Sequence, residues 1–326
     1  MSSILDQVVQ IGVESTYGTA VAPTRAFEAK TDTWQRDVEF IESVGFRKDQ
    51  QTIRSDRHDT ISVGASGSID CDVLTKGMGL LLQHSLGGSS GPTQQGGTAA
   101  YMSTFETNDV GPATSYTVQV AKADSNGGLQ AFTYEGSVVT GFNVTQDLGG
   151  ALSLTVDFDS EAEQNSTALA AASYPSGTDV FVYTDATIEI DDSAISTFTS
   201  FSLDGDLGMK TDRRFLKGSA VKGQPLRNAL PSYTGSLSGE FQVMAQYEAF
   251  VAGTTFKLEF IAAKSTAIAG SYYPTFKVTL PVCVFTGSTP TASLSDLSTI
   301  ELPFTVLDNG SDAAVKIEYT STDTSF

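Results

Sequence analysis

The chain has 326 residues, of which 40% are hydrophobic and 17% charged, and its 30 glycines lie among runs of Ser and Thr alternating with aliphatic residues. This composition is typical of an all-β protein with many turns. Because 38 acidic residues stand against 19 basic ones, the formal net charge is −19, the wrong sign for gripping nucleic acid through its phosphates. No apolar run approaches the roughly 20 residues of a membrane span, and the first residues do not resemble a secretory signal.

Residues 1–26 are expected to form an N-terminal arm, because they contain Gly18, Pro23 and scattered aliphatic residues without a sustained hydrophobic period. Such a composition does not fold alone. We expect the arm to become ordered by packing on a neighbouring subunit, and the alternative is simple terminal disorder.

The first domain is expected over residues 27–163. Strict alternation of apolar and polar residues predicts a strand over 60–73, and the apolar run 74–86 predicts a helix that stops at Gly87. Residues 87–114 are rich in Gly, Ser and Gln and are interpreted as a loop-rich insertion. A second alternating run over 154–158 predicts the closing strand of this domain.

A linker over residues 164–178 is expected to form a short helix and a turn, and it precedes a second domain over 179–326. Here the alternating strand spans 232–243, the helix 244–252, and the closing strand 300–304. The order of elements repeats that of the first domain, with glycine again ending the helix.

The repeated order indicates an internal duplication. The alternating strands align through Gly67 and Gly235. The closing strands align with each other, and Gly141 aligns with Gly287 at the same offset. The second offset is shorter than the first by about the length of the 87–114 insertion, as a duplication with one insertion requires. The alternative is that all β domains look similar at this level of detail.

Convergent catalytic groups are scarce in this sequence. His58 and His84 are the two histidines, and neither has a neighbouring Ser or Cys in a nucleophile motif. Cys71 and Cys283 lie far apart in apolar runs and are expected to be buried core residues. The aspartate pairs at 191–192 and 204–206 lack a third ligand at Ca²⁺-loop spacing. We therefore expect no enzyme activity, no cofactor and no metal site.

The segment Ile11–Thr24 resembles the N-terminal pattern of major tail tube proteins from phages with long, non-contractile tails. The blocks Thr60–Leu86, Phe132–Phe158 and Val180–Glu240 resemble the same family in the same order. The resemblance covers nearly the whole chain and consists of block patterns rather than invariant functional residues. It implies two similar β-sandwich or barrel-like domains, each with a flanking helix, and a structural role in the virion.

The resemblance also implies the partners. Copies of the chain would form rings that stack into a tube, and a chain with two domains would close a six-domain ring with three subunits. The tube would surround the tape-measure protein, meet the tail terminator and distal tail proteins at its ends, and let DNA pass without sequence-specific binding. Synthesis in the host cytoplasm follows from this role. The alternative is another β-rich surface or appendage subunit, such as an adhesin or a pilus-like protein.

Ten of the 19 basic residues cluster in two segments, each directly before the alternating strand of its own half. They are Arg47, Lys48, Arg54 and Arg57 in the first half, and Lys210, Arg213, Arg214, Lys217, Lys222 and Arg227 in the second. One interpretation is a pair of solvated hairpins. We favour loops that reach an acidic surface on the next ring and fix the stacking electrostatically.

Overall fold

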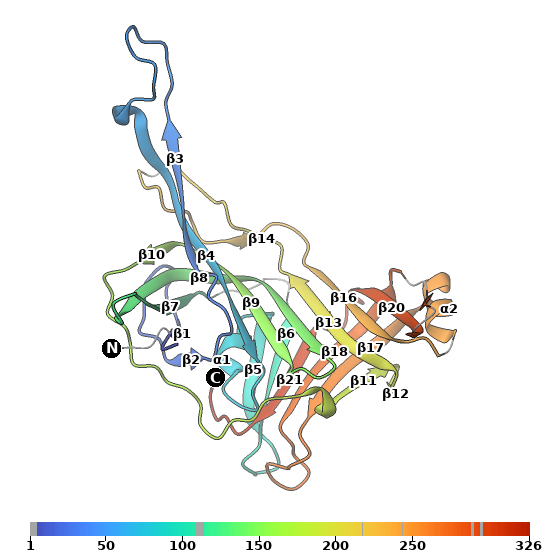
Figure 1. Cartoon of the computed structure of the whole chain (residues 1–326). Helices are drawn as coiled ribbons and strands as arrows, with labels where there is room; N and C mark the ends of the chain where they lie inside the picture. The colour runs from blue at the N-terminus through green and yellow to red at the C-terminus, as the bar shows by residue number, and fades with distance from the viewer. Residues whose placement is uncertain (1–4, 109–113, 217, 243, 288–289, 294–295) are drawn as a thin grey trace.

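The computed structural model describes residues 5–108, 114–216, 218–242, 244–287, 290–293 and 296–326 (Figure 1). Lys217, one of the basic residues predicted to contact the next ring, lies outside the described residues. The strands of the first half are β1 Val8–Val13, β2 Arg25–Phe27, β3 Gln35–Glu42, β4 His58–Asp72, β5 Gly87–Gln94, β6 Tyr101–Thr107, β7 Tyr116–Ala123, β8 Leu129–Asp147, β9 Ser153–Ser160 and β10 Ala162–Gln164. The strands of the second half are β11 Ala186–Ile190, β12 Ser193–Ile195, β13 Phe198–Asp206, β14 Met209–Lys210, β15 Leu226–Arg227, β16 Ser232–Glu240, β17 Thr255–Ala263, β18 Thr275–Phe285, β19 Thr291–Ser293, β20 Asp296–Val306 and β21 Lys316–Ser321.

The described residues contain two short α-helices, α1 (Gly79–Leu82) and α2 (Ala245–Ala252), and the 3-10 turns η1 (Ser55–Arg57) and η2 (Tyr183–Asp185). The fold is all-β, as the alternating sequence pattern predicted.

One twisted antiparallel sheet runs through both halves of the chain. Its strand order is β3–β4–β9–β8 in the first half and β13–β16–β20–β18 in the second, and β8 pairs with β13 at the junction. Because side chains alternate along each strand, Ile69, Val156 and Leu203 face a buried core. The opposite face is polar.

A second layer of strands covers the apolar face of this sheet. In the first half it contains β2, β1, β7 and the beginning of β8. Over the second half it contains β12, β11, β17, β18 and β21, together with β6 and β5 of the first half. The side chains between the layers form one continuous hydrophobic core.

Strand pairing has the same register in the two halves. Gly67 lies opposite Phe158 in β4–β9, and Gly235 lies opposite Phe304 in β16–β20. A pair of neighbouring hydroxyl groups also occurs at the same place in both halves. In the first half Thr33 Oγ1 lies 2.8 Å from Ser68 Oγ, and in the second half Ser202 Oγ lies 3.0 Å from Ser236 Oγ. Further corresponding pairs are Val139–Phe158 with Phe285–Phe304, Gln119–Thr133 with Glu259–Thr279, and Tyr116–Ser137 with Phe256–Cys283, the last at a shift of register in both halves.

The N-terminal segment is not a separate arm. Residues 8–13 form β1, which lies between β2 and β7 of the same chain and buries Val9 and Ile11. Glu14 is also buried, and its carboxylate accepts hydrogen bonds from Ser115 Oγ at 2.6 Å and Thr117 Oγ1 at 2.8 Å. The expectation of an arm was wrong here because a six-residue strand is too short to show its period against the surrounding polar residues.

Three other predicted elements differ from the structure. The helix expected over 74–86 is reduced to the single turn of α1, whereas the helix expected over 244–252 matches α2. The insertion 87–114 is not a loop in its described part but the hairpin β5–β6, which pairs with β21 of the second half. The linker 164–178 has no helix among its residues and runs extended along β1, β2 and β7, where Ala170 N–H donates to Gln119 Oε1 at 2.8 Å.

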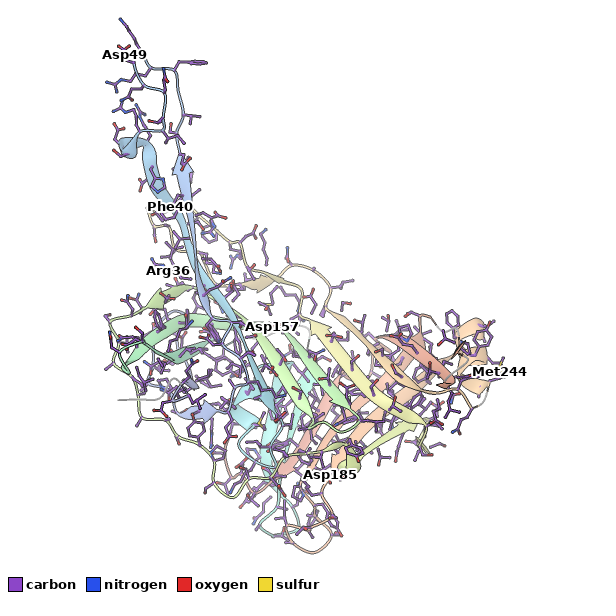
Figure 2. All side chains as sticks on the ribbon, in the orientation of Figure 1. Arg36, Phe40, Asp49, Asp157, Asp185 and Met244 are labelled. Atoms are coloured by element: carbon purple, nitrogen blue, oxygen red, sulfur yellow. The ribbon has the colours of Figure 1, made fainter. Side chains whose placement is uncertain are left out.

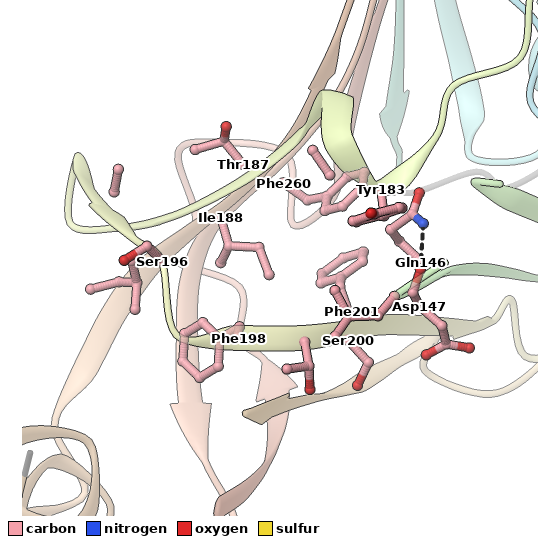
Figure 3. Close-up of a pocket in the computed structure, with 15 residues that line it drawn as sticks. Gln146, Asp147, Tyr183, Thr187, Ile188, Ser196, Phe198, Ser200, Phe201 and Phe260 are labelled. Atoms are coloured by element: carbon pink, nitrogen blue, oxygen red, sulfur yellow. Dashed lines mark hydrogen bonds between the residues drawn. The ribbon is translucent and has the colours of Figure 1, made fainter. Parts of the chain in front are cut away.

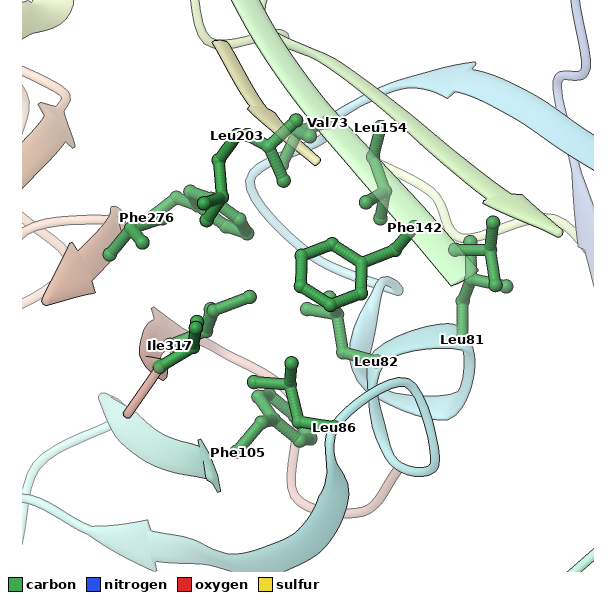
Figure 4. Packing of buried hydrophobic residues seen from close by; sticks show 14 of the residues in the cluster. Val73, Leu81, Leu82, Leu86, Phe105, Phe142, Leu154, Leu203, Phe276 and Ile317 are labelled. Atoms are coloured by element: carbon green, nitrogen blue, oxygen red, sulfur yellow. The ribbon is translucent and has the colours of Figure 1, made fainter. Parts of the chain in front are cut away.

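The seam between the two halves is filled by apolar side chains from both (Figure 4). Leu81, Leu82 and Leu86 from the α1 region meet Phe105 on β6 and Ile317 on β21, and all five are buried. The two halves therefore share a core instead of forming independent domains.

Replacing Phe105 with alanine should lower the free energy of unfolding by about 3–5 kcal/mol, because the side chain is fully buried in the shared core. The measurement is urea unfolding, followed by circular dichroism and by the fluorescence of Trp34, the single tryptophan. The control is Phe46→Ala, since Phe46 is fully exposed and its loss should leave the curve unchanged. Separate transitions from the two signals would contradict a shared core.

Candidate assembly surfaces

The polar face of the eight-stranded sheet is acidic. Side chains on this face alternate with the buried core residues, and many are Ser, Thr or Asn. Asp157 lies near the middle of the face on β9 (Figure 2). Carboxylates on this face include Asp37, Asp70, Asp72, Asp147, Asp157, Asp159, Asp204, Asp206, Glu240 and Glu301.

Basic residues are scarce on the eight strands of this sheet. Their sequences contain just Arg36 and Lys277, and neither belongs to the polar face of the sheet. Arg36 is two positions after the buried Trp34 and therefore points to the opposite face. Lys277 lies in the outer layer, where it pairs with Glu259 at 2.9 Å. Lys30, immediately before β3, neutralises part of the charge by pairing with Asp72 at 2.7 Å. Partial burial raises the pKa of Asp157 above its ordinary value, because burial disfavours the charged carboxylate.

The first basic segment is the tip of the long hairpin β3–β4, which projects far beyond the body of the molecule (Figures 1 and 2). Arg54 pairs with Asp56 beside it, whereas Arg47, Lys48 and Arg57 form no ion pair with any described carboxylate of the chain. Apolar side chains are exposed on the same hairpin, with 113% exposure for Phe46. The others are Phe40, Ile41, Val44, Ile53 and Ile61. A hairpin that carries both charge and exposed apolar area has the chemistry of a binding element.

The second basic segment is folded down onto the first half. Ala220 accepts a backbone hydrogen bond from Val63 N–H at 3.0 Å, so this loop continues the sheet beside β4. Arg213 donates to Gln224 O at 2.5 Å and Arg214 to Ala220 O at 3.3 Å, both within the segment. These two guanidinium groups therefore serve to hold the loop.

The other described cations of this segment also have partners in their own chain. Lys210 pairs with Asp212 at 2.8 Å, and Arg227 donates to Asn108 O at 2.7 Å. Arg54, Lys210 and Lys222 thus each form an ion pair with a carboxylate of their own chain.

Lys222 is the clearest departure from the sequence-based prediction of an exposed cation. It is 5% exposed and pairs with Asp159 of the first half. Burial raises the pKa of Asp159 above its ordinary value of 3.8, although the adjacent ammonium group of Lys222 acts in the opposite direction. This buried pair fastens the second basic segment to the first half, and no pattern in the sequence distinguishes Lys222 from its exposed neighbours.

An apolar groove lies at the end of the sheet opposite the hairpin (Figure 3). The end of β4 that is distant from the hairpin, Asp72, lies next to the turn that joins β8 and β9. This turn forms one wall of the groove. The groove has a volume of ≈ 270 Å³. The rings of Phe201 and Phe260 stack at 4.6 Å in its floor. Asp147 and Leu148 line the groove at the β8–β9 turn, and Tyr183, Ile188 and Phe198 line its other sides.

No described helix is long and apolar enough to cross a membrane. Within the described residues, no three His, Cys, Asp or Glu side chains gather as metal ligands would. The aspartates considered as Ca²⁺ ligands have other partners, since Asp192 pairs with Lys257 at 2.7 Å and Asp204 accepts a hydrogen bond from Asn143 at 2.5 Å. Cys71 and Cys283 are buried free thiols, and burial raises the pKa of each to about 12.

An all-β chain with two matching halves, an acidic sheet face and a projecting hairpin has the surfaces of a structural assembly subunit. A family model described as phage tail tube protein matches residues 5–306. The chain therefore belongs to the phage tail tube protein family. It is a structural subunit of a phage tail tube, a component of the virion that assembles with copies of itself. No curated protein sequence matches the chain.

Replacing Lys222 with methionine should lower the free energy of unfolding by about 3–5 kcal/mol at neutral pH, because the Asp159 carboxylate is then buried without its cation. This deficit should shrink as the pH falls through the raised pKa of Asp159, since protonation removes the uncompensated charge. Chemical unfolding at several pH values measures both effects.

Two variants serve as controls for this experiment. Lys222→Met combined with Asp159→Asn should recover much of the lost stability, because no charge remains buried. Lys210→Met removes an exposed pair and should leave the unfolding curve unchanged. Equal effects of Lys222→Met and Lys210→Met would contradict a fastening role for the buried pair.

Proposed function

We propose that three copies of this chain close a ring around a central lumen, and that such rings stack into the tube of a long, non-contractile phage tail. The observation that carries the proposal is the internal junction, where β8 pairs with β13 in the same chain. A strand of the first half and a strand of the second half are thus already joined edge to edge. The same joint, repeated between chains, would close a ring.

The matching register supports the view that residues 27–163 and 179–326 descend from one duplicated domain, to which β1 also contributes. The two free edges of the eight-stranded sheet fit the proposed joint. β3 corresponds to β13, and β18 with β19 corresponds to β8, because Thr291 lies opposite Thr299 as Thr145 lies opposite Ser153. The second-half edge of one chain would pair with β3 of the next. Unpaired edge strands are strong templates for such pairing.

In this ring the acidic face of the sheet would line the lumen. A wall of carboxylates repels the phosphates of passing DNA, whereas basic side chains would hold it through counterion release. The tape-measure protein would fill the same lumen before DNA arrives, and the tail terminator and distal tail proteins would cap the stack. We expect no enzyme activity and synthesis in the host cytoplasm. The family match does not favour the alternative of an adhesin or pilus-like subunit.

The β3–β4 hairpin would join consecutive rings. It projects from one end of the sheet, and the groove beside Asp147 and Leu148 opens at the other end. Apolar hairpin residues such as Phe46 suit the groove, and Arg47 and Lys48 suit its acidic surroundings. The second basic segment would support the hairpin base instead of reaching the next ring itself.

Cysteines introduced at Thr33 and Thr291 should form disulfides between chains, because these positions correspond to the paired residues Ser202 and Thr145 of the internal junction. Oxidised assemblies should then give a covalent ladder that stops at three chains on a denaturing gel. A ladder that reaches six would reject the three-chain ring.

The matched control places cysteines at Ser202 and Thr145, where oxidation should give a disulfide within a single chain. The two native thiols are buried and should not interfere. Crosslinking at the internal junction without any crosslinking between Thr33 and Thr291 would show that β3 is not the ring-closing edge.

Replacing Arg47 and Lys48 with glutamate should prevent stacking and leave ring formation intact, because both side chains lie on the projecting hairpin. Each exposed pair contributes up to about 1 kcal/mol, but every ring contributes several copies. Electron microscopy and sedimentation would distinguish tubes from free rings. Raised salt should weaken stacking of the unchanged protein in the same direction.

The control for this experiment is Gln50→Lys with Gln51→Lys, two changes on the same hairpin that add positive charge. This variant should form tubes at least as readily as the unchanged protein. Tubes of normal length from the glutamate variant would show that the charges of Arg47 and Lys48 are not needed for stacking.

A further inference from the structure

Helix α1 follows the alternating strand β4 and is buried at the junction between the two halves. All four of its residues are buried. A Cβ placed on Gly79 would lie 3.0 Å from the ring of Phe326, so the C-terminus of the second half packs directly on the helix. Tyr319 Oη also donates to Leu74 O at 2.8 Å across the same seam.

The helix α2 follows β16 as the α1 turn follows β4, but it lies at the free end of the molecule (Figure 1). None of its residues is buried. Ala249 and Phe250 pack against the core of their own half. Met244, at the start of the helix, is 48% exposed and Val251 is 66% exposed. These two are seven positions apart, so they share one side of the helix, and Tyr247 lies between them.

We infer that this outer side of α2, consisting of Met244, Tyr247 and Val251, docks on the first half of a second copy of this chain and is part of the ring-closing contact. The inference rests on the proposed ring. It follows from position, because α2 contacts β18, and β18 with β19 forms the edge that corresponds to β8 of the internal junction.

The chemistry of the two helices fits this assignment. At the internal junction the seam beside the sheet is apolar and closed by α1 and its leucines. At the free edge the corresponding apolar positions of α2 face solvent. Burying them against the next chain would add hydrophobic area to the backbone hydrogen bonds of the paired edges. Edge pairing alone would leave Met244 and Val251 exposed in every ring.

The test is Val251→Asp in the full chain, compared with the unchanged protein by sedimentation and electron microscopy. Val251 is exposed, so circular dichroism and thermal unfolding should match those of the unchanged chain. The concentration of chain needed for half of it to enter rings should rise on the order of tenfold or more, because the variant must bury a charge at the seam. Met244→Lys should act in the same direction.

The control is Val44→Asp, the same substitution at an exposed valine on the β3–β4 hairpin. It should leave ring closure unaffected and change stacking alone. If Val251→Asp closes rings at the same concentration as the unchanged protein, the assignment of α2 is overturned while the ring stands. If the unchanged protein closes no rings, the proposed ring is rejected, and the assignment of α2 is rejected with it.

Discussion

The joint between β8 and β13 is the interaction on which the rest of the structure depends. It pairs residues 141–147 with 200–206 and turns two half-sheets into one. An unpaired edge leaves a row of backbone donors and acceptors that must find partners. The chain satisfies this requirement inside the molecule at β8–β13 and leaves it open at β3 and at β18–β19. In the proposed ring, the contacts between chains would thus be of the same physical kind as the β8–β13 joint, and assembly would need no new type of interaction.

The same alternation that builds the core also sets the charge of the polar face. Each strand of the joined sheet contributes apolar residues to one side, and the other side receives Ser, Thr, Asp and Glu. Part of the acidity that the sequence shows only as a net value therefore lies on one surface. Where a carboxylate of this face becomes buried, as at Asp159, the chain supplies Lys222 as its partner. Charge is neutralised where packing requires it and retained where the surface is open.

Long periodic elements could be predicted from the sequence, and short or context-dependent ones could not. The strand over 60–73 was predicted nearly to its ends because it repeats its period several times, and the helix over 244–252 was predicted from an apolar run that stops at Gly253. The hairpin β5–β6 was missed because Gly87–Gln94 has almost no apolar residues and is a strand through its pairing with β6 alone. β1 was missed because six residues show too little alternation, and α1 because the helical spacing of leucines equally suits a buried turn.

The candidate site was predicted in part for a similar reason. Charge clustering identified both basic segments, and the first does project as an exposed hairpin. Nothing in the sequence separates Lys222 from Arg47, because burial depends on where a loop folds and not on its composition. The exposure of the apolar side of α2 could not be predicted either, since a sequence pattern does not distinguish an apolar helix side that packs on its own core from one that packs on another chain.

The two halves differ in a way that the identical domains of a ring of single-domain subunits could not. In the first half the segment before the alternating strand is a long free hairpin, and in the second half it is fastened across β4 by Lys222 and Asp159. A ring of six identical domains must present the same loop six times. In the proposed three-chain ring, the projecting hairpin and the fastened loop alternate, so the stacking contacts repeat every 120° and not every 60°. Stacking rotations that differ by 60° would then no longer be equivalent. In the proposed ring, the difference between the halves would therefore restrict the rotations with which one ring can stack on the next.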